Sequence, residues 1–129
     1  MILLDANVII WWMAGDKRLG AQAKELLARP DLDLSVSLLN LFEIELKSRI
    51  NKLSLTAPIS DFLDEFAVEV YSPSPNELTD MMSIKLNHSD PFDCALIGLA
   101  KIKDWTVMTS DGPLQKASSD LVTFIDSRK

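Results

Sequence analysis

Short apolar runs alternate with segments of helical periodicity along the whole chain. Runs typical of buried strands are predicted at 1–4, 32–37, 105–109 and 121–125, with a weaker one at 68–71. Helices are predicted from Val8 through Met13, from Asp90-Pro91 to about Lys103, and over 21–29, 38–51, 59–67 and 76–86. Strands that alternate with helices imply right-handed crossovers and a parallel sheet covered on both faces. The pattern predicts an α/β protein, a three-layer α/β/α sandwich with a central, mostly parallel sheet, in one domain over 1–129.

Composition fits a globular protein that forms its own core. Of 129 residues, 47% are hydrophobic and 25% charged, which argues against disorder. The single cysteine, Cys94, cannot form an internal disulfide, and the single histidine, His88, excludes a site of several imidazoles. The apolar stretch 1–14 is too short to span a bilayer and lacks the basic start of a signal peptide. We expect a cytoplasmic protein without membrane association.

Two aspartates lie at the ends of predicted strands, within two residues of the apolar run. Asp5 comes after the run at 1–4, and Asp111 comes after the run at 105–109. In a parallel sheet, ligands gather outside the carboxyl ends of the strands, so both side chains are candidates for a site. Two structural roles stay open: Asp5 as the N-cap of the next helix, and Asp111 as a turn residue before Gly112-Pro113.

Glu43 has an unusual place on the helix predicted over 38–51. At 100° per residue it falls within an apolar stripe, one turn after the stripe begins. That stripe consists of Leu39, Phe42, Leu46 and Ile50. An inward-facing carboxylate is costly unless a positive group meets it. We expect Glu43 to face a basic side chain, with Lys47 a candidate at i+4, or a metal ion.

Asp93 is the third residue of the helix that starts at Asp90-Pro91. It can belong to a capping box, or it can add a carboxylate at the same sheet edge. With Asp5, Glu43 and Asp111 it would place four carboxylates at one rim of the sheet, where at least one pKa should be raised. An oxygen-only ligand set without a histidine or cysteine cluster favours Mg²⁺ or Mn²⁺ over zinc, and these ions suit phosphoryl chemistry.

The overall charge by itself argues against a nucleic-acid partner. The chain has 13 basic and 19 acidic side chains, a formal net charge of −6. Bound metal ions would reverse the local sign at the acidic rim. Lys47, Arg49 and Lys52 are candidates for contacts with RNA phosphates; alternatively they form a solvated helix end that the helix dipole favours.

Four motifs in order carry a resemblance to a known family. They are Leu4-Asp5-Ala6-Asn7, Phe42-Glu43-Ile44, His88-Ser89-Asp90-Pro91-Phe92-Asp93 and Met108-Thr109-Ser110-Asp111. With them the sequence resembles the PIN-domain family, and most of all the VapC-type ribonuclease toxins of type II toxin–antitoxin modules. The resemblance covers nearly the whole chain, and 88–100 is its most specific part.

The resemblance implies a metal-binding quartet and an activity. By it, Asp5, Glu43, Asp93 and Asp111 match the family's acidic quartet, with Asn7 and Thr109 at polar positions beside it. It implies Mg²⁺- or Mn²⁺-dependent endonucleolytic cleavage of RNA by metal-activated water, a homodimer, and inhibition by a VapB-type antitoxin. Two residues depart from the pattern: Cys94 stands where an arginine is common, and Trp105 where a smaller residue is usual.

Other functions stay open beside this one. A non-catalytic PIN-like module that binds RNA or protein would not need four clustered acids. A different Mg²⁺-dependent phosphohydrolase of the aspartyl-phosphate type would carry an Asp-x-Asp pair at the first strand, which this sequence lacks. For a dimer or antitoxin surface the candidates are adjacent aromatic residues and two apolar residues outside the stripe, namely Trp11, Trp12, Leu41 and Ile44.

Overall fold

The structure is a computed structural model that describes residues 1–129 except 51–54, 56 and 89. In chain order its elements are β1 (Ile2–Leu4), α1 (Ala6–Ala14), α2 (Ala21–Leu27), β2 (Leu34–Ser37), α3 (Leu38–Arg49), α4 (Ile59–Glu65), β3 (Glu69–Tyr71), α5 (Pro75–Met82), α6 (Pro91–Lys103), β4 (Thr106–Thr109), α7 (Gly112–Ser118) and β5 (Phe124–Asp126). The strands form one sheet in the order β3-β2-β1-β4-β5, and every pair is parallel. The predicted sheet is confirmed.

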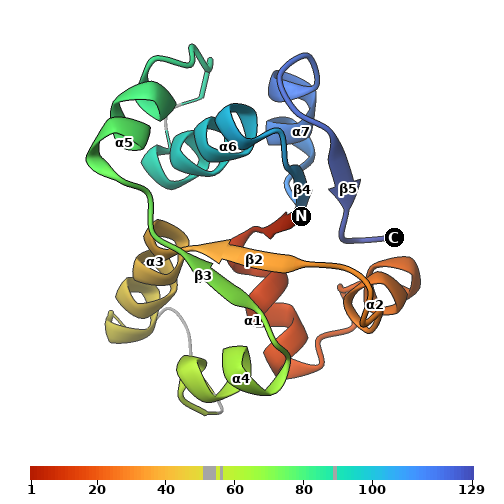
Figure 1. Cartoon of the computed structure of the whole chain (residues 1–129). Helices are drawn as coiled ribbons and strands as arrows, with labels where there is room; N and C mark the ends of the chain where they lie inside the picture. Colours follow the sequence, from red (N-terminus) through yellow and green to blue (C-terminus); the bar gives the residue numbers. More distant parts are fainter. Residues whose placement is uncertain (51–54, 56, 89) are drawn as a thin grey trace.

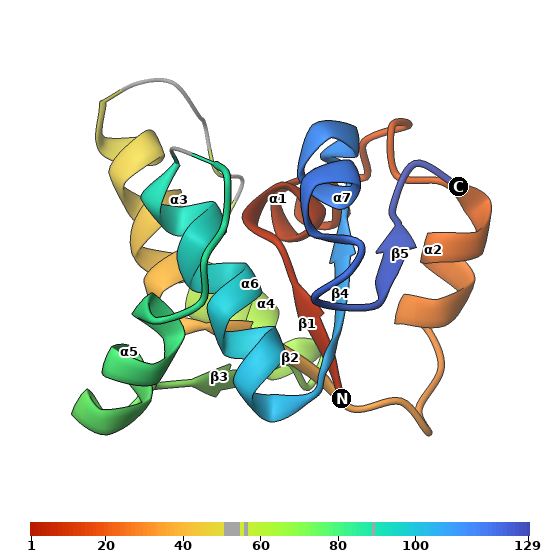
Figure 2. The ribbon, with the colours of Figure 1, turned by 90° about the horizontal axis from the view of Figure 1, so that it is seen from above.

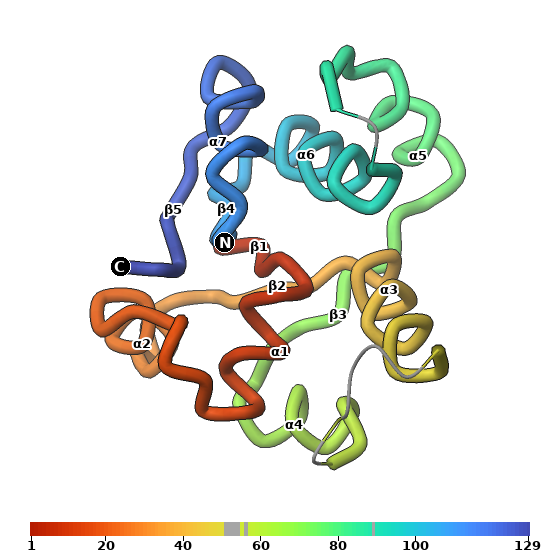
Figure 3. Tube along the Cα trace, turned by 180° about the vertical axis from the view of Figure 1, so that it is seen from behind, coloured from red at the N-terminus to blue at the C-terminus, as the bar shows by residue number. Residues whose placement is uncertain are grey.

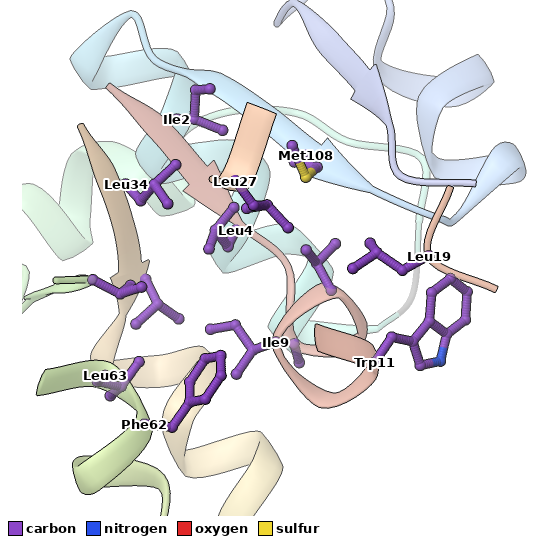
Figure 4. Packing of buried hydrophobic residues seen from close by; sticks show 14 of the residues in the cluster. Ile2, Leu4, Ile9, Trp11, Leu19, Leu27, Leu34, Phe62, Leu63 and Met108 are labelled. Carbon is purple, nitrogen blue, oxygen red and sulfur yellow. The ribbon is translucent and has the colours of Figure 1, made fainter. Parts of the chain in front are cut away.

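Helices cover both faces of the sheet (Figure 1). Successive side chains of β1 point to opposite faces of the sheet. Leu4 belongs to the core formed with α1, α2 and α4, whereas Leu3 belongs to the core formed with α5, α6 and α7. Figure 4 shows the first of these clusters, in which Leu4 and Met108 of the sheet meet Ile9 of α1. Two cores on opposite faces of one sheet are the three-layer sandwich that the sequence predicts.

The predicted elements are present, with ends that differ by at most four residues. Helix α7 is an addition, because the sequence suggests only a turn after β4. Asp111 caps it, accepting a hydrogen bond from the Leu114 backbone N–H at 2.9 Å, and proline stands in its first turn. A cap followed by proline starts a helix even where the apolar pattern is too short to show one.

The end of the chain packs against the start of α2. The Gly20 backbone N–H donates to the Ser127 carbonyl at 2.8 Å, and that of Gln22 donates to the Lys129 carbonyl at 2.7 Å. A side chain at position 20 would collide with the Lys129 backbone, so this approach requires glycine. Figure 3 shows the carboxyl-terminal segment beside α2.

Helix α3 corrects the prediction about its apolar stripe. It lies at the carboxyl end of the strands and contacts both α1 and α6, and Figure 2 shows it beside α6. Its buried side chains are Asn40, Glu43 and Ile44, so the side turned inward is not the stripe. Four exposed residues instead form what we call the α3 surface: Leu38 (49% exposed), Phe42 (59%), Leu46 (40%) and Ile50 (52%).

The predicted partner surface at Trp11, Trp12, Leu41 and Ile44 is therefore wrong in part. Ile44 is fully buried in the core, and Leu41 is half-buried against it. Trp11 is buried, and the Arg18 guanidinium lies over its ring at 4.7 Å from the centroid. Trp12 packs edge-on against Phe62 of α4, with ring centroids 5.0 Å apart. Packing within the chain covers most of this set.

Among the described residues, no helix is both long and apolar enough to cross a membrane.

Candidate metal centre

Asp5 and Asp111 lie at the same edge of the sheet because β1 and β4 are parallel neighbours. Leu4 pairs with Met108, so the two strands end side by side. Thr109 links the aspartates: its hydroxyl donates to Asp5 Oδ2 at 2.6 Å and accepts from the Asp111 backbone N–H at 3.1 Å. A buried threonine thus fixes the spacing of two carboxylates, and the expected polar place of Thr109 beside them is observed.

Asp5 is buried and both of its oxygens accept hydrogen bonds. Besides Thr109, the Ala6 backbone N–H donates to Oδ1 at 2.7 Å, so Asp5 also caps α1. Burial is the main reason that the pKa of Asp5 is raised to about 6, and the nearby charges of Asp93 and Glu43 raise it further against these hydrogen bonds. The direction agrees with the raised carboxyl pKa expected from the sequence.

Glu43 projects from the inward side of α3 and is buried. The Lys47 ammonium lies 3.0 Å from its Oε2, which is the basic partner predicted at i+4. Asn40 donates to the other oxygen, Oε1, at 3.3 Å. Asn40 itself is fully buried, and its Oδ1 has no hydrogen-bond partner among the described residues. An orphaned buried oxygen beside a carboxylate is the setting that a cation or its water would satisfy.

Asp93 does not act through a capping box. The N-cap of α6 is Asp90, whose Oδ1 accepts from the Phe92 and Asp93 backbone N–H groups at 2.8 and 3.3 Å. The Asp93 carboxylate points instead to His88, whose Nε2 lies 2.7 Å from Oδ2. Burial raises the pKa of Asp93, the His88 hydrogen bond opposes this, and the charges of Asp90 and Asp111 add to the rise.

One group of donors is close enough to hold a single ion: His88, Asp93 and Asp111 each offer a ligand atom, all within 4.8 Å of one another. Asp5 adjoins this group and Glu43, since the charges of Asp93 and Glu43 both raise the pKa of Asp5. Carboxylates from β1, β4, α3 and α6 are thus brought to one place, and this donor set fits a divalent cation.

The donor set expected from the sequence has oxygen atoms only, whereas the structure also brings the His88 imidazole to Asp93 and Asp111. A single histidine excludes a site of several imidazoles, but it does not exclude a site that combines one imidazole with carboxylates. The available signal was its place five residues before Asp93, across the start of a helix. Among the other predicted residues, Asn7 is exposed on the first turn of α1 and Arg49 is exposed at the end of α3, while Lys52 lies outside the described residues.

The fold and this edge of the sheet together define an α/β protein, a parallel α/β/α sandwich with a candidate metal site where β1 and β4 end. The model of the PIN domain family matches residues 2–119, so the chain belongs to the PIN domain family. The resemblance expected from the four motifs is confirmed.

Relatives and solved structures agree with this assignment. Ribonuclease VapC22 of Mycobacterium tuberculosis is 26% identical over 117 residues, covering 88% of this chain and 89% of that protein. VapBC2 of Rickettsia felis, bound to a DNA fragment from their promoter, aligns with a TM-score of 0.68 at 17% identity over 98% of each chain. VapBC-1 of nontypeable Haemophilus influenzae aligns with a TM-score of 0.63 at 17% identity over both whole chains. The two structures share this fold.

Proposed function

We propose that the protein is a metal-dependent endoribonuclease and the toxin of a VapBC-type toxin–antitoxin pair. The observation that carries the proposal is the gathering of Asp5, Glu43, Asp93 and Asp111, from four separate elements, at one sheet edge. A structural protein has no reason to keep such a cluster, because burial and mutual repulsion both disfavour it. Similarity to Ribonuclease VapC22 over most of both chains supports the choice of RNA as substrate.

In this proposal the four carboxylates hold Mg²⁺ or Mn²⁺, and the surrounding side chains orient them. Thr109 keeps Asp5 turned toward the sheet edge, and Lys47 balances the charge of Glu43. A bound divalent ion supplies a more acidic water and neutralises charge on the phosphate. Arg49, exposed on the last turn of α3, is the candidate in this proposal for a contact with the RNA backbone. Cleavage then needs no covalent enzyme intermediate and no imidazole pair.

The proposed inhibitor is a VapB-type antitoxin, in keeping with the VapBC complexes that share the fold. An acidic pocket at a sheet edge is a natural target for arginine, whose planar fork pairs with carboxylates. We therefore expect the antitoxin to place a basic side chain among Asp5, Glu43, Asp93 and Asp111 or to block their rim. Toxin and antitoxin would meet RNA in the cytoplasm.

The proposed homodimer forms through the α3 surface. The exposed apolar residues Leu38, Phe42, Leu46 and Ile50 form a strip along α3 beside a hollow of about 440 Å³, and an exposed apolar strip of this kind is typical of an interaction surface. When two copies of α3 lie antiparallel about a two-fold axis at the middle of this strip, Leu38 of one copy faces Ile50 of the other and Phe42 faces Leu46, so the surface is self-complementary.

The nuclease proposal is tested with purified protein and total RNA in Mg²⁺, in Mn²⁺ and in EDTA, followed by mapping of the cleavage ends. We expect cleavage at defined positions with either ion and none in EDTA. Asp5→Asn, which keeps the shape and removes an anionic ligand, should abolish cleavage. Asp64→Asn makes the same chemical change at an exposed position of α4 and should leave cleavage unchanged.

Two results would contradict the proposal. Cleavage by Asp5→Asn at the wild-type rate would show that Asp5 is not a ligand of the metal. RNA bound but left intact in both metals would favour the non-catalytic PIN-like binding module instead.

The dimer proposal is tested by sedimentation. We expect the wild type to be a dimer and Phe42→Glu to be a folded monomer. Val70→Glu, at an exposed apolar position of the edge strand β3, should stay dimeric. A wild type that is monomeric at every accessible concentration would overturn the interface.

A further inference from the structure

His88 lies beside two of the carboxylates of the candidate metal centre, Asp93 and Asp111. Its Nε2 lies 2.7 Å from Asp93 Oδ2, and its side chain is 23% exposed, against 13% for that of Asp93. The ligand atoms of His88, Asp93 and Asp111 lie within 4.8 Å of one another. Ligand atoms around one small divalent ion, each about 2.0–2.2 Å from it, are separated by roughly 3–4 Å. Small side-chain movements bring these three into that range.

The chain holds His88 at this place from two sides. The Cys94 thiol, on the first turn of α6, donates to the His88 carbonyl at 3.3 Å. Asp90, two residues after His88, caps the same helix, which fixes where α6 begins. Cys94, one of the two residues that depart from the family pattern, thus fastens the backbone of the histidine to the helix that carries Asp93.

We propose that His88 is a further ligand of the metal centre and makes it select Mn²⁺ and other transition ions over Mg²⁺. The inference rests on the proposed function only in that both place a divalent ion among the same carboxylates. Imidazole nitrogen binds first-row transition ions well, whereas Mg²⁺ prefers oxygen donors and retains its water. A ligand set with one nitrogen therefore separates the two ions in a way that carboxylates alone do not.

Coordination and the present hydrogen bond use the same nitrogen. An ion bound between the two side chains would take Nε2 from His88 and Oδ2 from Asp93, replacing the 2.7 Å contact between them. The rival role for His88 is to orient Asp93 by a hydrogen bond without touching the ion. That role makes it a positioning residue, and glutamine, whose amide N–H can donate to Asp93, would preserve it.

The test is pulsed electron paramagnetic resonance of the full chain loaded with Mn²⁺. We expect a ¹⁴N coupling in the wild type that is lost in His88→Gln, because the only imidazole is then gone. Calorimetric titration should show Mn²⁺ affinity falling by about tenfold or more in His88→Gln, with Mg²⁺ affinity changing by less than about threefold. Asn87→Ala, at the exposed neighbouring position, should behave as the wild type in both measurements.

The outcomes separate this inference from the proposed nuclease. Mn²⁺ bound without a ¹⁴N coupling, or equal loss of Mn²⁺ and Mg²⁺ affinity in His88→Gln, overturns the His88 assignment and leaves the nuclease standing. A ¹⁴N coupling in a protein that cleaves no RNA supports the ligand and contradicts the nuclease. A chain that binds neither ion contradicts both.

Discussion

Helices α3 and α6 each bring one carboxylate to the metal centre, yet the rest of the chain covers them very differently. On α6 six consecutive residues, Ala95 to Ala100, are buried between the sheet and α5. On α3 the inward side holds Asn40, Glu43 and Ile44, and the strongest apolar residues face outward as the α3 surface. An apolar stripe on a helix marks a surface to be covered, and it does not say whether the cover belongs to the same chain.

The two helices also show how a site replaces part of a core. Glu43 takes a place on α3 that an isolated domain would fill with an apolar side chain, and Lys47 and Asn40 then partner its oxygens. Asp93 stands at the start of α6, in front of the buried run, so the packing of that helix needs no polar compensation.

The largest expected effect comes from truncating a leucine on each helix. Leu96→Ala on α6, where the side chain is fully buried, should lower the free energy of unfolding by about 2–5 kcal/mol. Leu46→Ala on α3, where it is 40% exposed, should cost less than about 1 kcal/mol in the monomer. Urea unfolding measures both values, and the Phe42→Glu background keeps dimerisation out of the comparison. Equal losses of unfolding free energy for the two variants would contradict the difference in burial between α6 and α3.

The next effect is a fall in stability with rising pH in the metal-free protein. Because the pKa of Asp5 is about 6 in the folded state and 3.8 in the unfolded chain, the folded state holds a proton that the unfolded state has released. The contribution of Asp5 to the free energy of unfolding should therefore be greatest below about pH 4 and should fall by about 3 kcal/mol as pH rises through about 6. Unfolding in EDTA across this range should show the slope, and Asp5→Asn should remove it.

The pKa of Asp5 also shows which of the two helices brings its carboxylate closer in effect. The charge of Asp93 raises the pKa of Asp5 more than the charge of Glu43 does. Asp93→Asn on α6 should therefore lower the Asp5 pKa further than Glu43→Gln on α3, as followed by the NMR shift of the Asp5 carboxyl carbon. The reverse order would place Glu43 closer to Asp5 in solution.

A slightly smaller effect is expected from metal binding. An ion that binds the folded site and not the unfolded chain should add about 2.7 kcal/mol at 100 times its Kd, a melting shift of very roughly 5–10 °C. Asp93→Asn should shrink that shift and raise the metal-free melting temperature, because it removes a charge from a crowded, partly buried site. Thermal melts in EDTA and across a Mn²⁺ titration measure both. A lower metal-free melting temperature for Asp93→Asn would instead mean that the Asp93 carboxylate stabilises the first turn of α6.

The smallest effect concerns the contact between α5 and α6. A Cβ at position 98 would lie 2.8 Å from the Met81 carbonyl oxygen, so the two helices touch at Gly98. Gly98→Ala should destabilise the protein by about 1–3 kcal/mol, with the better helix propensity of alanine offsetting part of the strain. An unchanged free energy of unfolding for Gly98→Ala would show that α5 can shift away from α6 at no cost.

Local patterns were enough to predict the strands, most helices and two of the site carboxylates. Strand runs are short and strongly apolar here, and an aspartate directly after such a run must lie at the carboxyl end of the sheet, whatever the helices do. Asp5 and Asp111 therefore followed from the chain alone. The motif at 88–93 also carried the family resemblance, because its residue types stand in fixed order along the sequence.

Only the tertiary structure decided what each helix turns toward. Periodicity shows that Phe42 and Leu46 share a side of α3, but it does not show that this side faces out. That orientation depends on how α3 packs against α1 and α6. The burial of Ile44 has the same cause. The contact between His88 and Asp93 across the start of α6 likewise depends on how the chain enters that helix, and the five-residue spacing alone does not fix it. Sequence determines which residues are available for burial and binding, and packing between distant elements determines which of them meet.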